Sequence, residues 1–161
     1  MGSLTVSWSD PHALAHAGRE LTGLEFLRAI RDGRLPAPPI AELLGFRLVE
    51  AEPGHAVFEV QPDERHYNPI GVVHGGLAMT LLDSAMGCAV QTQVPEGAAY
   101  ATLEAKTNLT RAITVSTGKL RAIGKVVHLG SRVATAEGRL VDGEGRLYAH
   151  ATTTCIVLRE G

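Results

Sequence analysis

Aromatic residues are scarce in this chain of 161 residues, which has one Trp, three Tyr and three Phe. Proteins that bind single-stranded nucleic acid use such rings as stacking platforms. Charge offers no other attraction, because 15 basic residues face 17 acidic ones and leave no global positive field for polyanions or anionic membranes. We therefore expect no nucleic-acid partner, no membrane partner and a core built from aliphatic side chains.

Cysteine is also nearly absent from the sequence. Cys88 and Cys155 are the only two, and they form no CxxC pair. This excludes a Cys-rich zinc site and fits a reducing compartment better than a disulfide scaffold. The histidines show no metal-ligand spacing, and His55 and His66 are expected at solvated loop ends. The sequence thus predicts a cytoplasmic protein without a metal site.

Long apolar runs are missing as well. The most apolar stretch, Leu77 to Val90, is interrupted by Asp83 and is shorter than the roughly 20 residues that span a bilayer. The chain does not open with a basic segment followed by an apolar one. We expect neither a membrane span nor a signal peptide.

The first 39 residues are predicted to form a helical extension. Apolar residues recur at near-helical spacing between Asp10-Pro11 and Gly33, which predicts one amphipathic helix, and residues 36–39 form a stiff Pro-rich connector. A short helix from Ile40 to Leu44 would end at Gly45, because glycine favours the C-terminal cap. Residues 40–161 are expected to form the main domain, which is close to the usual size of one domain.

The main domain shows the pattern of a sheet around one helix. From Phe46 onward the sequence changes to an alternating pattern with a period of two residues. Ala56, Phe58 and Val60, for example, alternate with Val57, Glu59 and Gln61, as in a half-buried strand. A helix after Gly75-Gly76 is apolar almost all round and belongs in the interior. Four more strands follow, at residues 102–110, 118–128, 131–141 and 146–158, with a hairpin turn at 142–145. The order predicts an α+β fold in which a curved antiparallel sheet wraps around one long central helix.

The residues best suited to catalysis lie around the start of that helix, from Asn68 to Gly76, and at Asp83 within it. A helix N-terminus preceded by glycine presents unpaired N–H groups and a partial positive charge, which suit a carbonyl oxygen that gains negative charge. Asp83 lies within the apolar helix, where a carboxylate is costly to desolvate unless it is paired or used. We therefore expect a site that combines an oxyanion stabiliser with a carboxylate base.

Distance suggests that two chains share this site. Gly75 and Asp83 are eight residues apart, or about 12 Å along a helix at ~1.5 Å per residue. An attacking atom must come within about 3 to 3.5 Å of the carbonyl, so one chain alone is not expected to supply both groups. An antiparallel pair of these helices about a two-fold axis would bring Gly75 of one subunit toward Asp83 of the other.

These residues resemble the hotdog-fold acyl-CoA thioesterases of the phenylacetate-pathway (PaaI-like) family. The resemblance covers roughly Leu43 to Leu158 and leaves the first forty residues outside. Its most specific part is the set Asn68, His74-Gly75-Gly76, Asp83 and Thr102.

The resemblance implies a dimer or dimer of dimers that hydrolyses a CoA thioester without a metal or redox cofactor. The Gly75 N–H would polarise the carbonyl, and Asp83 of the facing subunit would be nucleophile or general base. Thr102 would orient the attacking water or the carboxylate, while Asn68 and His74 would steady the thioester, and Gly76 would belong to the substrate-binding loop.

Each residue also has a structural interpretation. Asp83 could be satisfied by N–H groups of a neighbouring strand, His74 could support its loop, and Asn68 could set the turn before Pro69. Thr102 is an ordinary strand residue, so its role depends on the resemblance.

A CoA partner requires cations for its phosphates. Five basic residues cluster in the strand region: Arg111, Lys119, Arg121, Lys125 and Arg132. Gly130-Ser131-Arg132 forms a turn with backbone donors beside an arginine and is the preferred candidate for phosphate contact. The alternative for each cation is a solvated strand face.

Three functions compete. The favoured one is acyl-CoA hydrolysis. A non-catalytic acyl-CoA sensor would hold the same ligand without a base, and Asp83 argues against it. A hydratase or dehydratase would use a His and a carboxylate in a proton relay, but the spacing of His74 and Asp83 differs from that pattern.

Overall fold

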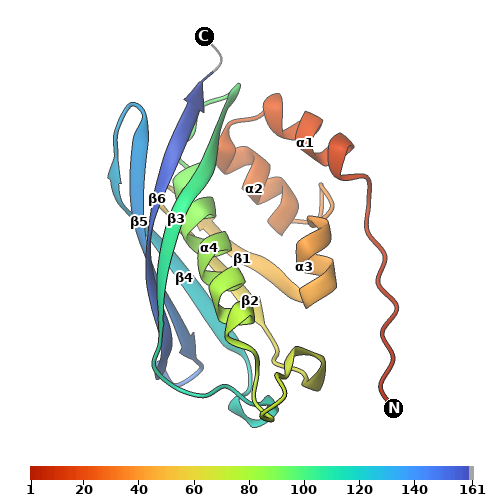
Figure 1. The fold of residues 1–161 in the computed structure, drawn as a ribbon. Helices are drawn as coiled ribbons and strands as arrows, with labels where there is room; N and C mark the ends of the chain where they lie inside the picture. The colour runs from red at the N-terminus through yellow and green to blue at the C-terminus, as the bar shows by residue number, and fades with distance from the viewer. Residues whose placement is uncertain (160–161) are drawn as a thin grey trace.

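The computed structural model describes residues 1–159, which form three N-terminal helices followed by a six-stranded sheet around a fourth, longer helix (Figure 1). The strands are all antiparallel in the order β1-β2-β4-β5-β6-β3. The helices are α1 (Pro11–Arg19), α2 (Gly23–Arg31), α3 (Pro39–Leu44) and α4 (Gly75–Gln91). The strands are β1 (Phe46–Glu52), β2 (His55–Val60), β3 (Ala98–Leu109), β4 (Leu120–Leu129), β5 (Val133–Asp142) and β6 (Leu147–Arg159).

The helix α4 packs directly on the sheet, against β2, β4 and β5. Its sheet-facing side is fully buried and includes Leu82, Ala85 and Met86. Two glycines paired across β4 and β5, Gly124 and Gly138, lie beneath it. A Cβ atom at Gly124 would come within 2.1 Å of the Ala85 carbonyl oxygen, and one at Gly138 within 3.0 Å of the Leu82 side chain. The helix therefore rests on bare backbone.

The predicted order of elements is confirmed: two strands, the buried helix, then four strands. The α+β architecture, with an antiparallel sheet around a central helix, is likewise confirmed. The short helix α3 ends at Gly45 as predicted, and Gly45 adopts the left-handed conformation with φ 70°. Local periodicity and one cap residue were sufficient for these elements.

The single N-terminal helix of the sequence analysis is wrong, because the segment forms two helices. The Thr22 hydroxyl accepts from the Glu25 N–H, and the Glu25 carboxylate accepts from the Thr22 N–H, which makes a capping box that begins α2 anew. The helix α2 is bound to β1, because Arg28 donates to the Ala51 carbonyl oxygen at 3.1 Å, and α1 buries Leu14. A Cβ at Gly23 would collide with the Gln91 backbone at 1.8 Å. The division of the chain after residue 39 stays a prediction.

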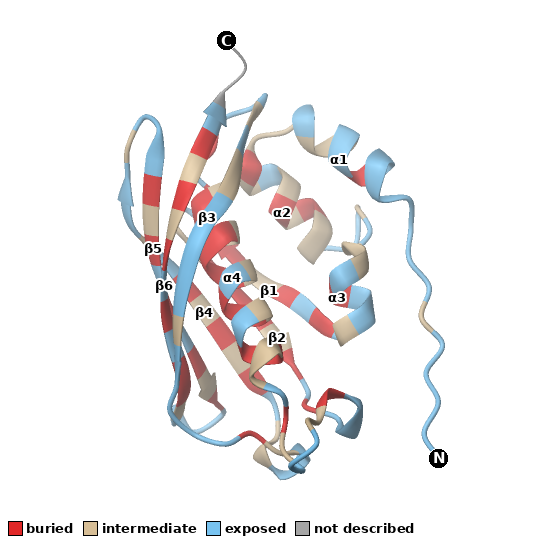
Figure 2. Cartoon of the chain, in the orientation of Figure 1, coloured by how far each residue is buried: buried red, intermediate tan, exposed pale blue. Residues whose placement is uncertain are grey.

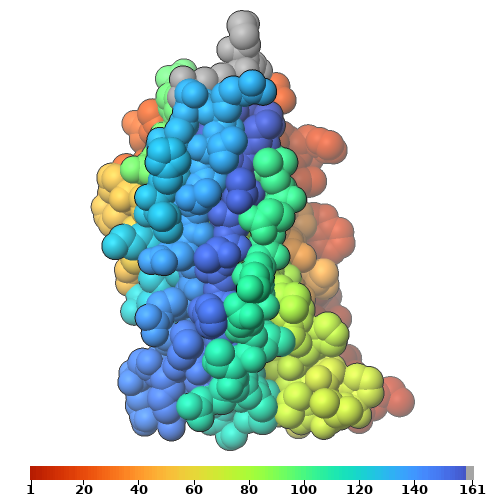
Figure 3. All heavy atoms as spheres, turned by 60° about the vertical axis from the view of Figure 1, so that its left-hand side comes forward, coloured from red at the N-terminus to blue at the C-terminus, as the bar shows by residue number. Residues whose placement is uncertain are grey.

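The strand β3 forms one edge of the sheet and departs from the half-buried pattern expected of it. From Thr102 to Lys106 its residues are exposed on both faces, as the pale blue of Figure 2 shows. In Figure 3, which brings the outer face of the sheet forward, β3 runs in green along the margin. Within one chain nothing pairs with its outer edge among residues 1–159, which leaves a row of backbone groups open.

None of the helices in the described part of the chain has the length and apolar character needed to cross a membrane.

The close approach of α4 to the sheet gives a stability prediction. Gly124→Ala places a methyl group against the Ala85 carbonyl, which cannot move without displacing the helix, so we expect a loss of about 1–3 kcal/mol or more in the free energy of unfolding. Gly143→Ala is the matched control, because a Cβ there meets nothing within 4 Å. Urea unfolding of both variants measures the difference. Equal stabilities would contradict the packing described above.

Candidate active site

The loop before α4 is shaped by Asn68. Its side-chain oxygen accepts hydrogen bonds from the N–H groups of Ile70, at 3.1 Å, and Val72, at 3.2 Å. Gly71 completes the turn with φ 82° and donates to the Asn68 carbonyl oxygen at 3.2 Å. The turn-setting interpretation of Asn68 therefore has direct structural support. Because the side-chain oxygen of Asn68 already accepts two hydrogen bonds, only its amide nitrogen is free to contact a substrate.

The helix α4 begins with His74 as its N-cap. His74 Nδ1 accepts the N–H of Gly76 at 2.8 Å, and the His74 N–H donates to the His66 carbonyl oxygen at 2.7 Å. Gly76 therefore gives its N–H to the cap. Gly75 is the first helical residue, and its N–H has no acceptor inside the helix. Of the two glycines, Gly75 is the one that can offer an N–H to a ligand.

A cavity of about 350 Å³ lies at this end of the helix. Its walls include Asn68 and Gly75 from the loop and helix start, and Leu109 and Arg111 from the end of β3. A Cβ at Gly75 would come within 2.5 Å of the Leu109 side chain, so glycine keeps the space beside the helix N-terminus open. The helix dipole and the exposed Gly75 N–H make this cavity suitable for a carbonyl oxygen with negative character.

Asp83 lies farther along the same helix, on its exposed side. Thr102 Oγ1 of β3 donates to Asp83 Oδ1 at 2.9 Å. The carboxylate is exposed in the single chain, so the desolvation that the sequence analysis expected is not provided by this chain. Thr102 thus fixes one oxygen of a carboxylate that faces outward from α4, next to the open edge of the sheet.

Asp83 does not line the cavity at Gly75. Eight helical residues, or about 12 Å, separate the two positions. The structure therefore brings Asn68, His74, Gly75 and Gly76 together at one end of α4, and pairs Asp83 with Thr102 about two turns away.

The turn Gly130-Ser131-Arg132 lies at the other end of the sheet from Gly75. It connects β4 to β5, and Val133 pairs with Ile156 near the end of β6. Leu109, beside Gly75, pairs instead with Ala149 near the start of β6. Within one chain this turn does not join the cavity at the helix N-terminus.

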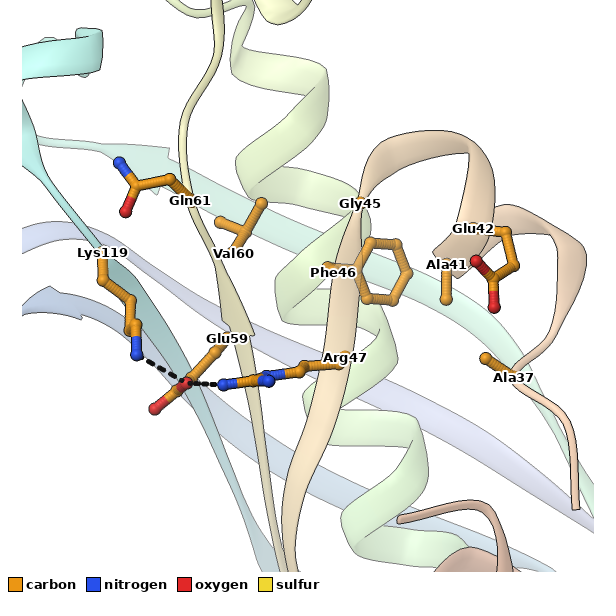
Figure 4. A pocket seen from close by; sticks show the side chains of 10 residues that line it. All are labelled: Ala37, Ala41, Glu42, Gly45, Phe46, Arg47, Glu59, Val60, Gln61 and Lys119. Carbon is orange, nitrogen blue, oxygen red and sulfur yellow. Dashed lines mark hydrogen bonds and ion pairs between the residues drawn. The ribbon is translucent and has the colours of Figure 1, made fainter. Parts of the chain in front are cut away.

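Arg111 is the cation that the structure places at the cavity, although the sequence analysis named it only as one of five. Its guanidinium carbon lies 5.7 Å from the centre of the Tyr148 ring. The sequence did contain a signal for this placement: Arg111 follows the end of β3 by two residues, on the segment that passes the start of α4. Lys119 is instead bound to Glu59 at 3.3 Å, in a second cavity where Arg47 makes the same contact at 3.3 Å (Figure 4).

His66 is buried and locks the loop to α3, so the expectation of a solvated side chain is wrong. Its Nδ1 accepts the Asp63 N–H at 3.0 Å, and its Nε2 lies 3.0 Å from the Leu44 carbonyl oxygen. Burial, followed by the nearby charge of Arg65, lowers the pKa of His66 below its ordinary value. Since the His66 carbonyl also receives the His74 N–H, this neutral imidazole supports the start of α4.

Comparison with known proteins identifies the family. The thioesterase superfamily model matches residues 70–149. A Saccharolobus solfataricus protein, provisionally named an esterase, is 31% identical over 133 residues, which cover 83% of this chain and 93% of that one. Human acyl-coenzyme A thioesterase 13 is 39% identical over 59 residues, or 36% of this chain and 42% of its own. This chain belongs to the thioesterase superfamily.

Solved structures agree with this assignment. A mutant of the phenylacetic acid degradation protein PaaI from Thermus thermophilus matches with a TM-score of 0.68 and 30% identity, over 76% of this chain and 100% of that one. A thioesterase family protein from Silicibacter pomeroyi matches with a TM-score of 0.74 and 25% identity, over 83% and 99%. The hotdog fold and the PaaI-like resemblance of the sequence analysis are confirmed.

His66 gives a pH prediction. The pKa of His66 is lower in the folded protein than in the unfolded chain. As pH falls below about 6.5, the unfolded chain therefore takes up a proton at His66 before the folded protein does. Stability should therefore decrease from about pH 6.5 down to the folded pKa, and the His66 contribution should be constant below that. His66→Gln should lose less stability than the wild type between pH 7.5 and 5 in thermal unfolding. His12→Gln, on an exposed position of α1, should behave as the wild type. Identical pH profiles for all three proteins would contradict the locked neutral imidazole.

Proposed function

We propose that this protein hydrolyses an acyl-CoA thioester to a free acid and CoA, in a homodimer or dimer of dimers whose sites are shared between two subunits. The Gly75 N–H polarises the thioester carbonyl. Asp83 of the partner subunit acts as nucleophile or general base, and Thr102 orients it. The observation that carries the proposal is an outward-facing carboxylate, held by a hydroxyl, which is the one charged group on α4 and lies beside an open strand edge.

The chemistry needs few groups. Attack on the thioester carbonyl puts negative charge on its oxygen, and an N–H at a helix N-terminus stabilises that charge. The thiolate leaves readily, so a carboxylate that attacks or removes a proton from water is enough to complete the reaction. No metal or redox cofactor is required for these steps. His74 and Asn68 hold the loop that presents Gly75.

A second subunit would complete the site. The open edge of β3 offers twelve residues for antiparallel pairing with the same strand of a second copy, and such pairing would extend the sheet through a two-fold axis. That axis would set the two α4 helices antiparallel and bring Gly75 of one toward Asp83 of the other. The partner would also cover Asp83, Thr102 and the exposed Met79 and so supply the desolvation that one chain lacks.

The remaining assignments extend this proposal. Two free thiols, Cys88 and Cys155, support a cytoplasmic location. Arg111, at the cavity beside Gly75, and the Gly130-Ser131-Arg132 turn of the partner subunit are the candidates for contact with the CoA phosphates. The acyl-CoA sensor remains the alternative outcome of the assays below.

Asp83 is the first test. In a thiol-release assay over a panel of acyl-CoAs, Asp83→Asn and Asp83→Ala should lower kcat by about 10²-fold or more, because the base or nucleophile is lost. Thr102→Val, which removes only the hydroxyl, should lower kcat less, and Thr102→Ser should keep most of it. Substrate affinity should survive in all four. Equal turnover by the wild type and both Asp83 variants would remove Asp83 from the mechanism, and no release from any thioester would favour the sensor.

Gly75 tests the oxyanion role and the shared site together. Gly75→Pro removes the N–H while proline remains tolerated at the first helical position, so kcat should fall about 10²- to 10³-fold. Gly75→Ala is the matched control, since it adds a Cβ beside Leu109 but keeps the N–H. Mixed dimers of Gly75→Pro and Asp83→Ala chains should regain part of the activity. Mixtures as inactive as their components would argue for a site within one chain.

A further inference from the structure

Two neighbouring apolar cavities lie between the N-terminal helices and the C-terminal half of α4. One has a volume of about 250 Å³ and is walled by side chains that include Leu14, Ile30, Leu48 and Phe58. The other, of about 390 Å³, is walled by Ala15, Gly18, Ala98 and Tyr100 among others. They share three wall residues: Phe26, Leu27 and Cys88. The N-terminal helices therefore cover two mainly apolar cavities that open to solvent and share part of their walls.

Asp83 lines neither cavity, but residues of β3 and α4 connect it to their walls. Residues 98, 100 and 102 of β3 lie on one face of the strand, because side chains alternate along it. On that face Thr102 bonds to Asp83, and Tyr100 lies against Gly87, where a Cβ would come within 2.3 Å of its hydroxyl. Ala98 already lines the second cavity. Successive positions on β3 thus lead from the carboxylate to the cavity wall.

Positions along α4 likewise lead from Asp83 to the cavity wall. Cys88, a wall residue of both cavities, follows Asp83 by five residues, or about 7.5 Å along α4. In the proposed site, a thioester whose carbonyl carbon lies at Asp83 has its carbonyl oxygen at the N–H of Gly75 of the partner subunit. Its acyl side can then run toward Tyr100 and Cys88, a length that an aryl group or a chain of several carbons covers.

We propose that these cavities are the acyl subsite, that they select an uncharged aryl or medium-length alkyl acyl group, and that the N-terminal helices set its size. This rests on the proposed thioesterase function. An apolar cavity of about 150 Å³ already holds a benzene ring, so 250 Å³ accepts a larger apolar group.

The charges at the smaller cavity and the shared thiol agree with an uncharged occupant. Arg31 and Arg47, which border the smaller cavity, are bound to Asp32 at 2.8 Å and to Glu59 at 3.3 Å. Arg19, which borders the larger cavity, makes no ion pair within residues 1–159 and is exposed to solvent. Burial raises the pKa of the Cys88 thiol to about 12, so Cys88 serves as a wall and not as a nucleophile. The helices α1 and α2 that cover the cavities lie outside residues 70–149, the part of the chain that matches the family model.

A pair of alanines on α1 offers a matched test. Both Ala13 and Ala15 are exposed, but only Ala15 lines the larger cavity, and Ala13 lines neither. Ala15→Trp should fill the cavity, and Ala13→Trp adds the same ring facing elsewhere. Cys88→Leu places a larger side chain on the wall that the two cavities share and so reduces their volume from the α4 side. The ratio of kcat/KM for octanoyl-CoA and benzoyl-CoA to that for acetyl-CoA is measured for all three variants, with thermal unfolding as the check on folding.

Ala15→Trp and Cys88→Leu should lower these ratios by about tenfold or more. In an apolar pocket, the loss of contact with even one methylene group changes kcat/KM by about that factor. Ala13→Trp should keep the wild-type ratios. Wild-type ratios in both cavity variants, or an equal loss in Ala13→Trp, would overturn the acyl subsite.

A wild-type protein that releases no thiol would refute the proposed function instead. Binding separates the two failures: octanoyl-CoA titrated calorimetrically into the Asp83→Asn protein should bind at least tenfold more weakly once Ala15→Trp is added. Unchanged affinity would overturn the subsite, whatever the turnover.

Discussion

The contact of α4 with the glycine pair Gly124 and Gly138 is the constraint on which the rest of the structure depends. Because the helix backbone rests on bare strand backbone, the helix can neither rise from the sheet nor rotate without a collision or a void. Its rotation sets which residues point inward and which outward. Leu82 and Met86 are buried against the sheet, and Asp83 therefore points away from it, at the height of Thr102.

That rotation also explains why one chain looks incomplete. The carboxylate and the helix start are held by separate contacts about 12 Å apart, and both open toward the side where β3 has no neighbour. An exposed strand edge and an exposed carboxylate are each costly or unproductive alone. Pairing of two copies along β3 would satisfy the edge and bring the two groups together in the same step, so the proposed assembly and the proposed chemistry depend on one interface.

Sequence patterns predicted most, but not all, of the features that depend on neighbours along the chain. The strands, the buried helix and the Gly45 cap follow from periodicity and from single residues. The restart of the helix at Thr22 was also readable, since Thr22 and Glu25 have capping-box spacing. The burial of His66 and the placement of Arg111 depend on segments distant in sequence, which periodicity does not report. Alternation in β3 indicates that a face is to be covered, but it cannot say whether this chain or a second copy covers it.

The helix α4 also separates the functions along its length. Its first turn offers an N–H, its third carries the carboxylate, and its last turns form a wall of the apolar cavities. Since α1 and α2 line those cavities, residues of these helices would change the size of the proposed acyl subsite without touching Gly75, Asp83 or the glycines under the helix. If α4 carries the proposed chemistry, a helix fixed by the sheet and a separate cover over its far end would let one reaction be kept while the acyl group it accepts is altered.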